Sequence, residues 1–181
     1  SRQIALQYWK FILVNTNFNH INAFGDGLNL FQSVQKPGET PKFGRAARGM
    51  SLAYAEGLRD HKTAVFEDFQ RLIPELERVF PEHTVVVRPH PTEKHDAYQK
   101  LAADCQRVKV TNAGNVVPWL MATQAVIHNG CTTGVEAYVM GVPVIAADLG
   151  ALREKVSDGK ILWGRTSYER GYSVVTTTKY L

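Results

Sequence analysis

Five short segments rich in apolar residues recur along the chain, and each is followed by a polar stretch. Most of them are unbroken apolar runs, which are typical of strands buried on both faces of a parallel sheet. The segments are 11–14, 84–87, 107–111, 124–127 and 142–145. We therefore expect five strands whose polar exit loops follow one after another.

Stretches with helical spacing separate these segments. Between residues 49 and 79, apolar residues recur every three or four positions, which predicts two helices or one helix bent near Asp60. Shorter helices are predicted over 92–104, 116–122 and 132–140. Strands that alternate with helices predict an α/β fold, a doubly wound parallel sheet with right-handed crossovers.

Two parts of the chain do not follow this alternation. Residues 22–48 show no sustained periodicity and are rich in Gly and Pro, which is typical of a long connection that is a lid, a binding loop or disordered. After residue 157 the rhythm stops, so we expect one domain over 1–157 and an unassigned tail over 158–181. The chain begins at Ser1 and runs directly into the first strand, which suggests a segment of a longer protein.

Composition narrows the class of protein. Apolar residues make up 44% and charged residues 21% of the 181, which argues against a disordered or collagen-like chain. The net charge of +4 suits a phosphate-bearing ligand and does not call for nucleic acid. Cys105 and Cys131 lie too far apart for a zinc motif or a disulfide framework. The sequence also has no stretch of about 20 apolar residues, the length that a helix needs to span a bilayer. These features favour a cytoplasmic protein without a metal.

The loop His128-Asn-Gly-Cys-Thr-Thr-Gly134 joins a predicted strand to a predicted helix. Gly130 allows a sharp turn, and Thr132 and Thr133 present hydroxyls where the first helical N–H groups point outward, which favours an anion. The alternative is that Thr132 only caps the helix. Glu136, one turn later, can accept hydrogen bonds from both hydroxyls of a ribose or simply compensate the helix dipole.

A second candidate site is Arg88-Pro-His-Pro91, where two prolines fix His90 at a strand's exit. His90 can hydrogen-bond a phosphate or protonate a leaving phosphate oxygen, and Arg88 can neutralise its charge. The alternative is a turn histidine beside a helix that Thr92 caps, with Glu93 in the first helical turn. Metalloprotease, P-loop, redox CxxC and serine hydrolase motifs do not occur.

The segments VVVRPHP (85–91) and NVVPWLMATQAVIHNGCTTGVEAYVMGVPVIA (115–146), with FILVNTNFNH (11–20), together resemble a known family. The chain is similar over about 11–157 to the C-terminal nucleotide-binding domain of GT-B glycosyltransferases, above all bacterial capsule and lipopolysaccharide biosynthesis proteins. The His-Pro pair and the Thr-rich loop resemble transferases that use CMP-activated sugars. The second segment also resembles the CDP-glycerol glycerophosphotransferases.

The resemblance implies a Rossmann-like domain that binds a nucleotide-sugar donor without a metal or other cofactor. It places His90 at the donor phosphate as the catalytic residue, Thr132 and Thr133 on the phosphate oxygens, and Glu136 on the ribose. The loop with Asn112 and Asn115 would meet the base, and Asn17, Arg88 and Gly130 would also line the site.

The same resemblance implies partners. They are a glycan or lipid-linked acceptor and an N-terminal Rossmann-like domain in the parent protein, in the cytoplasm and at the periphery of the inner membrane. Two other functions stay open. The chain could be a nucleotide-sugar epimerase of the same architecture, or a non-catalytic module that binds a nucleotide sugar.

Overall fold

The computed structural model describes residues 2–24, 30–31, 33–34, 36–40, 42–43 and 50–146. The predicted tail 158–181 and the end of the predicted domain, 147–157, lie outside the described residues. So does much of the predicted connection 22–48.

Five strands form one parallel sheet. They are β1 (Phe11–Asn15), β4 (Thr84–Arg88), β5 (Val108–Val110), β6 (Ala125–His128) and β7 (Val144–Ala146). Their order is β5-β4-β1-β6-β7, with β1 in the centre and paired in parallel with both β4 and β6. Strands β4 and β5 are added on one side of β1, and the chain then returns to add β6 and β7 on the other side. This is the Rossmann-like order, and it confirms the predicted doubly wound α/β fold.

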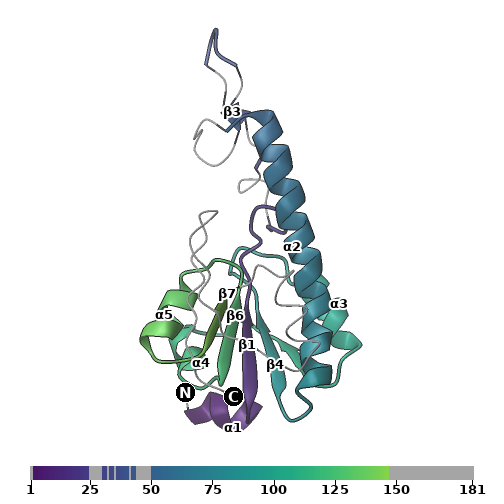
Figure 1. The fold of residues 1–181 in the computed structure, drawn as a ribbon, viewed down its shortest axis with the longest axis vertical. Helices are drawn as coiled ribbons and strands as arrows, with labels where there is room; N and C mark the ends of the chain where they lie inside the picture. The colour runs from purple at the N-terminus through teal and green to yellow at the C-terminus, as the bar shows by residue number, and fades with distance from the viewer. Residues whose placement is uncertain are drawn as a thin grey trace.

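Helices cover both faces of the sheet (Figure 1). They are α1 (Arg2–Tyr8), α2 (Leu52–Val79), α3 (Asp96–Ala103), α4 (Val117–Leu120) and α5 (Thr133–Val139). A small antiparallel hairpin, β2 (Ser33–Val34) with β3 (Lys42–Phe43), lies apart from the main sheet. None of the helices that the structure describes combines the length and the apolar character needed to cross a bilayer.

Alternate residues of β1 divide the core into two layers. Ile12 and Val14 pack with residues of α2 and α3, whereas Phe11 and Leu13 pack with residues of α4 and α5. All five residues of β1 are buried, as the unbroken apolar run predicted. The central strand β1 therefore contacts both helical layers, and these contacts fix the start of the loop that follows it.

The first helix was not expected from the sequence. The expectation that the chain runs directly into a strand is wrong, because residues 2–8 form α1 before β1 begins. Ile4 and Tyr8, four residues apart, pack against the core layer of α4 and α5. The Tyr8 ring lies 5.3 Å from that of Trp119, so this short helix is held by tertiary contacts.

The longest helix extends well beyond the sheet. Residues 52–79 form the single helix α2, rather than two helices, and 28 residues span about 42 Å. Its C-terminal half packs on the sheet, while its N-terminal half rises above the carboxyl ends of the strands toward the β2–β3 hairpin (Figure 1). The carboxyl edge of the sheet therefore has a helical wall on one side.

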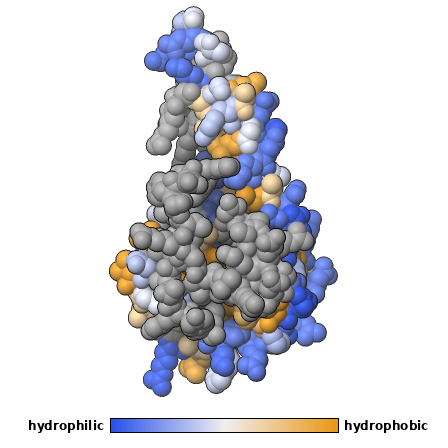
Figure 2. All heavy atoms as spheres, in the orientation of Figure 1, coloured by the Kyte–Doolittle hydropathy of each residue, from blue (hydrophilic) through white to orange (hydrophobic). Residues whose placement is uncertain are grey.

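Hydropathy differs between the two sides of the molecule. Exposed large side chains gather on α5: Val135, Tyr138, Val139 and Met140. Figure 2 shows orange spheres at this edge of the molecule. The opposite side, along α3 and the lower part of α2, is mainly hydrophilic in the same view.

Candidate functional site

The candidate site lies at the carboxyl ends of β1 and β6, where the chain reverses the direction in which it adds strands. Crossovers leave these two strands toward opposite faces of the sheet, and we call the region between the crossovers, beyond the strand ends, the crevice. Ligands of open α/β sheets bind in this position. Asn17 follows β1, and Gly130, Thr132 and Thr133 follow β6. The fold therefore brings these four predicted site residues to one crevice.

The Asn129 side chain joins the loops after β1 and β6 through two hydrogen bonds to backbone groups, as a neighbouring strand would. Its Oδ1 accepts a hydrogen bond from the Asn17 backbone N–H (2.6 Å), and its Nδ2 donates to the Asn17 carbonyl (3.2 Å). A second contact lies alongside, because Asn15 Nδ2 donates to Thr133 Oγ1 at 3.0 Å. Side chains thus continue the β1–β6 pairing beyond the sheet and fix the floor of the crevice.

His128, the last residue of β6, organises the turn that follows. Its ring is buried, and Nδ1 accepts hydrogen bonds from the N–H groups of Gly130 (3.1 Å) and Cys131 (3.3 Å). The neutral ring therefore carries its proton on Nε2. Burial lowers the pKa of His128 to about 4, so the ring is neutral at pH 7 and serves as an acceptor.

Two glycines make room for this arrangement. Gly130 has φ +82°, a left-handed conformation that side chains other than glycine adopt at a cost. A Cβ on Gly134 would lie 2.2 Å from His128 Nε2, so only glycine allows the helix to approach the ring this closely. The Gly130 turn that the sequence predicted is confirmed, and Gly134 has a packing role that the sequence did not indicate.

The two threonines differ in what their hydroxyls do. Thr132 stands at the N-cap of α5 and is exposed, and its side chain makes no capping hydrogen bond. Thr133 Oγ1 accepts from Asn15 and lies 2.6 Å from Cys131 Sγ, a thiol whose pKa is raised by burial. Glu136 is half-buried in the first turn of α5. Thr132 is thus open to a ligand, whereas Thr133 is already engaged.

A buried carboxylate supports the loop after β4. Glu93 is fully buried, and its Oε1 accepts from the Thr16 hydroxyl (3.0 Å) and from the His90 N–H (3.1 Å). Its Oε2 accepts from the Tyr98 hydroxyl at 2.8 Å, and burial raises the pKa of Tyr98. Glu93 therefore ties together β1, the His90 loop and α3.

This network overturns one sequence prediction. Thr92 does not cap a helix and Glu93 is not in a first turn, because α3 begins at Asp96 with His95 at its N-cap. The cap signal is local, whereas Glu93 bonds to Thr16, 77 residues earlier, and segment 92–95 turns inward to allow this. An isolated bridge between Ala23 and Glu93 holds the same segment to the loop after β1.

The His90 ring is oriented by its neighbour. Nδ1 lies 2.8 Å from Thr92 Oγ1 and accepts from the Thr92 N–H at 3.3 Å. In the neutral ring the proton therefore sits on Nε2, which leaves that nitrogen as the donor. Since β4 lies next to β1, His90 stands one strand away from the crevice, on the side opposite to Thr132.

The remaining predicted residues are Arg88, at the end of β4, and two residues of the loop after β5. Arg88 is buried and donates to the carbonyls of Ala113 (2.9 Å) and Gly114, and its guanidinium stacks on Trp119. Burial lowers its pKa, and no carboxylate pairs with it among the described residues. Asn115 Oδ1 accepts from the Val117 N–H at 2.8 Å, and Asn112 is half-buried nearby in sequence. Arg88 thus holds this loop in place.

Sequence reasoning missed three residues that build the site: Asn129, His128 and Glu93. Their roles depend on which strands are neighbours, and the amino acids around them carry no local signal for that. Among the described residues, no three His, Cys, Asp or Glu side chains are placed to hold a metal ion.

Fold and site define a Rossmann-like α/β domain with a polar crevice at its strand-order reversal. Comparison with protein-family models finds no match to the chain, and no curated protein matches it.

Proposed function

We propose that this domain binds a nucleotide-sugar donor in the β1–β6 crevice, as the donor half of a glycosyltransferase of bacterial surface-carbohydrate biosynthesis. The observation that carries the proposal is the coincidence of the strand-order reversal with the turn Gly130–Thr133 and the start of α5. A CMP-activated sugar is the donor that the sequence resemblance favours.

The phosphate is the part of such a donor that the turn suits best. The Thr132 hydroxyl has no capping partner among the described residues, and the N–H groups of Thr132 and Thr133 lie beside it, whereas those of Gly134, Val135 and Glu136 already donate to carbonyls of the turn. Thr133 would act through its fixed position, since Asn15 and Cys131 already hold its hydroxyl. Glu136, one turn along α5, would accept the ribose hydroxyls.

His90 is proposed as the catalytic group. It follows β4, two strand spacings or about 10 Å from β6 across the sheet. With Nδ1 occupied by Thr92, its Nε2 would donate to the donor phosphate and stabilise the charge that develops on the leaving group. Arg88, Asn112 and Asn115 would shape the side of the crevice that receives the base.

The acceptor would come from outside this domain. We propose a glycan or lipid-linked acceptor, presented by a second Rossmann-like domain of the parent protein at the cytoplasmic face of the inner membrane. The domain alone would then bind nucleotide and transfer no sugar.

Calorimetric titration with CMP, CDP, UDP, GDP and inorganic phosphate tests the proposal. We expect a cytidine nucleotide to bind most tightly, and Thr132→Val to weaken it about tenfold or more, the scale of one hydrogen bond to a charged group. Thr84→Val, at the amino edge of the sheet, is the matched control and should bind as wild type does. Absence of nucleotide binding, or equal affinity in folded Thr132→Val, would refute the proposal.

A further inference from the structure

One cation lies on the apolar face of α2. The residues of this helix that are fully buried recur with helical spacing, and they include Ala55 and Phe69. Lys62 is seven residues after the first and seven before the second, so it projects from the same face of the helix. It is half-buried there, whereas the charged residues next to it in sequence, Asp60 and His61, are exposed.

The position of Lys62 along the helix puts it above the sheet. One turn further on, Phe66 packs against Phe18, which follows β1, with 4.9 Å between the ring centroids, and against Tyr98. These contacts fix Phe66 at the level of the carboxyl edge. Lys62 lies four residues nearer the N-terminus of α2, about 6 Å higher. It therefore lies beyond the carboxyl edge of the sheet, on the face of α2 that packs on the strands further along the helix.

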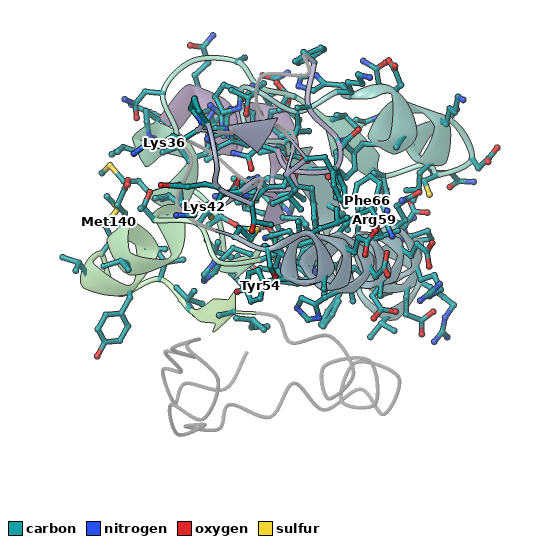
Figure 3. The ribbon with its side chains drawn as sticks, turned by 90° about the horizontal axis from the view of Figure 1, so that it is seen from above. Lys36, Lys42, Tyr54, Arg59, Phe66 and Met140 are labelled. Carbon is teal, nitrogen blue, oxygen red and sulfur yellow. The ribbon has the colours of Figure 1, made fainter. Side chains whose placement is uncertain are left out.

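Figure 3 views the molecule from above and shows which side chains lie on the α2 side and on the α5 side. In Figure 3, Phe66 and Arg59 lie on the α2 side of the molecule and Met140 of α5 on the other. Lys36 and Lys42, from the β2–β3 hairpin region, lie over the α5 side in the same view. Figure 1 shows, however, that this hairpin stands beside the N-terminal end of α2, well beyond the carboxyl edge of the sheet, and Lys42 pairs with Glu39, so these two lysines do not line the edge.

Lys62 differs from its basic neighbour Arg59 in having no counterion within the described part of the chain. Arg59 pairs with Asp60 at 2.8 Å and stacks on Phe31. Lys62 makes no ion pair or hydrogen bond with any described residue, and burial alone lowers the pKa of its amine. Burial of a cation that no described residue pairs costs free energy.

We propose that Lys62 binds the phosphate group of the ligand from the α2 side of the crevice. This inference rests on the proposed function only for the identity of the ligand as a nucleotide. An amine on a flexible stem suits this task, since it can reach a phosphate as a point charge. The phosphate would then lie between Lys62 above and the Thr132 turn below.

The experiment compares two ligands that differ only in the phosphate, CMP and cytidine, by calorimetry. In Lys62→Met, which keeps the length of the side chain, affinity for CMP should fall about tenfold or more, the scale of a hydrogen bond to a charged group. Affinity for cytidine should stay the same. Lys62→Arg should restore most of the loss, and CMP binding to Lys62→Met should depend less on salt.

Lys10→Met is the matched control, because it removes the same charge at the amino edge of the sheet, where Lys10 pairs with Glu82. It should bind CMP as wild type does. Thermal unfolding without ligand checks the fold, and Lys62→Met should be no less stable than wild type, since an unpaired charge has been removed from a half-buried site.

The outcomes separate this inference from the proposed function. Equal affinity of wild type and Lys62→Met for CMP and for inorganic pyrophosphate would overturn the role of Lys62, whatever nucleotide binds. If no nucleotide binds but pyrophosphate binds wild type and not Lys62→Met, the role of Lys62 stands and the nucleotide function falls. A parallel loss of CMP and cytidine would also overturn it, since the phosphate would not be the group that Lys62 contacts.

Discussion

Lowering the pH should destabilise the domain through His128, and the structure gives the size of the effect. The folded ring has a pKa of about 4 because it is buried, whereas an unfolded histidine titrates near 6.5. Between these values the unfolded chain binds the extra proton and the folded chain does not. Stability is therefore complete above about pH 7, falls as the pH drops toward 4, and is not lowered further by this group below that.

The difference between the two pKa values corresponds to about 3 kcal/mol. The loss would occur at the candidate site, because a proton on Nδ1 would remove the acceptor that holds the N–H groups of Gly130 and Cys131. Loss of nucleotide affinity should accompany the loss of stability, if the turn is the phosphate site.

His128→Asn isolates this contribution from that of the carboxylates. Asparagine Oδ1 can take the place of Nδ1 as the acceptor for the two N–H groups, and it does not titrate. Urea unfolding, followed by far-UV circular dichroism from pH 7.5 to pH 4, gives the stability of each protein. The advantage of wild type over His128→Asn should shrink by about 3 kcal/mol across this range.

A constant difference between wild type and His128→Asn would refute the reasoning, because it would mean that the buried ring does not resist protonation. His61→Asn, at an exposed position of α2, shows whether the loss of any histidine is enough. If His61→Asn reproduced the effect, the assignment to the buried ring would fail as well.

Two further predictions concern the packing around the site. Gly134→Ala should cost about 2 kcal/mol in wild type, where the new methyl meets the His128 ring, and clearly less in His128→Asn, which lacks the two nearest ring atoms, Nε2 and Cε1; additive effects in urea unfolding would contradict this. Glu93→Ala should cost about 3 kcal/mol, because three buried donors lose their acceptor, whereas exposed Glu67→Ala should stay within about 0.5 kcal/mol; equal small losses would show that the network is not stabilising.

The sheet could be predicted because its signal is contained in each strand alone. An unbroken apolar run such as Phe11–Val14 has to be buried on both faces, and only a parallel sheet between two helical layers does this. The alternation of strands and helices is then compatible with only a few ways of connecting the strands in the sheet. Boundaries moved by one or two residues, as with β6, which includes His128 rather than ending before it.

Where the prediction was wrong, a contact distant in sequence outweighed a local preference. The sequence around Thr92 and Glu93 has the pattern of a helix start, yet Glu93 gains more from the Thr16 and Tyr98 hydroxyls than a first-turn acid gains from the helix dipole. Helix α1 was missed for a similar reason, because its seven residues are stabilised by Tyr8 on Trp119 rather than by their own pattern.

In the candidate site too, the residues that could be predicted are those with a local sequence pattern, and those that depend on distant contacts were missed. Gly130 and Thr132 could be found because a glycine followed by hydroxyls at the start of a helix is a local pattern with a local meaning. Asn129 could not, since its carboxamide is useful only if β1 lies beside β6. Lys62 is predictable in part. The helical spacing places it on the apolar face of α2, and a cation on an apolar face stands out in the sequence. Its meaning depends on the length of α2 beyond the sheet, because the same lysine two turns later would be buried against the strands and would have to be paired or neutral.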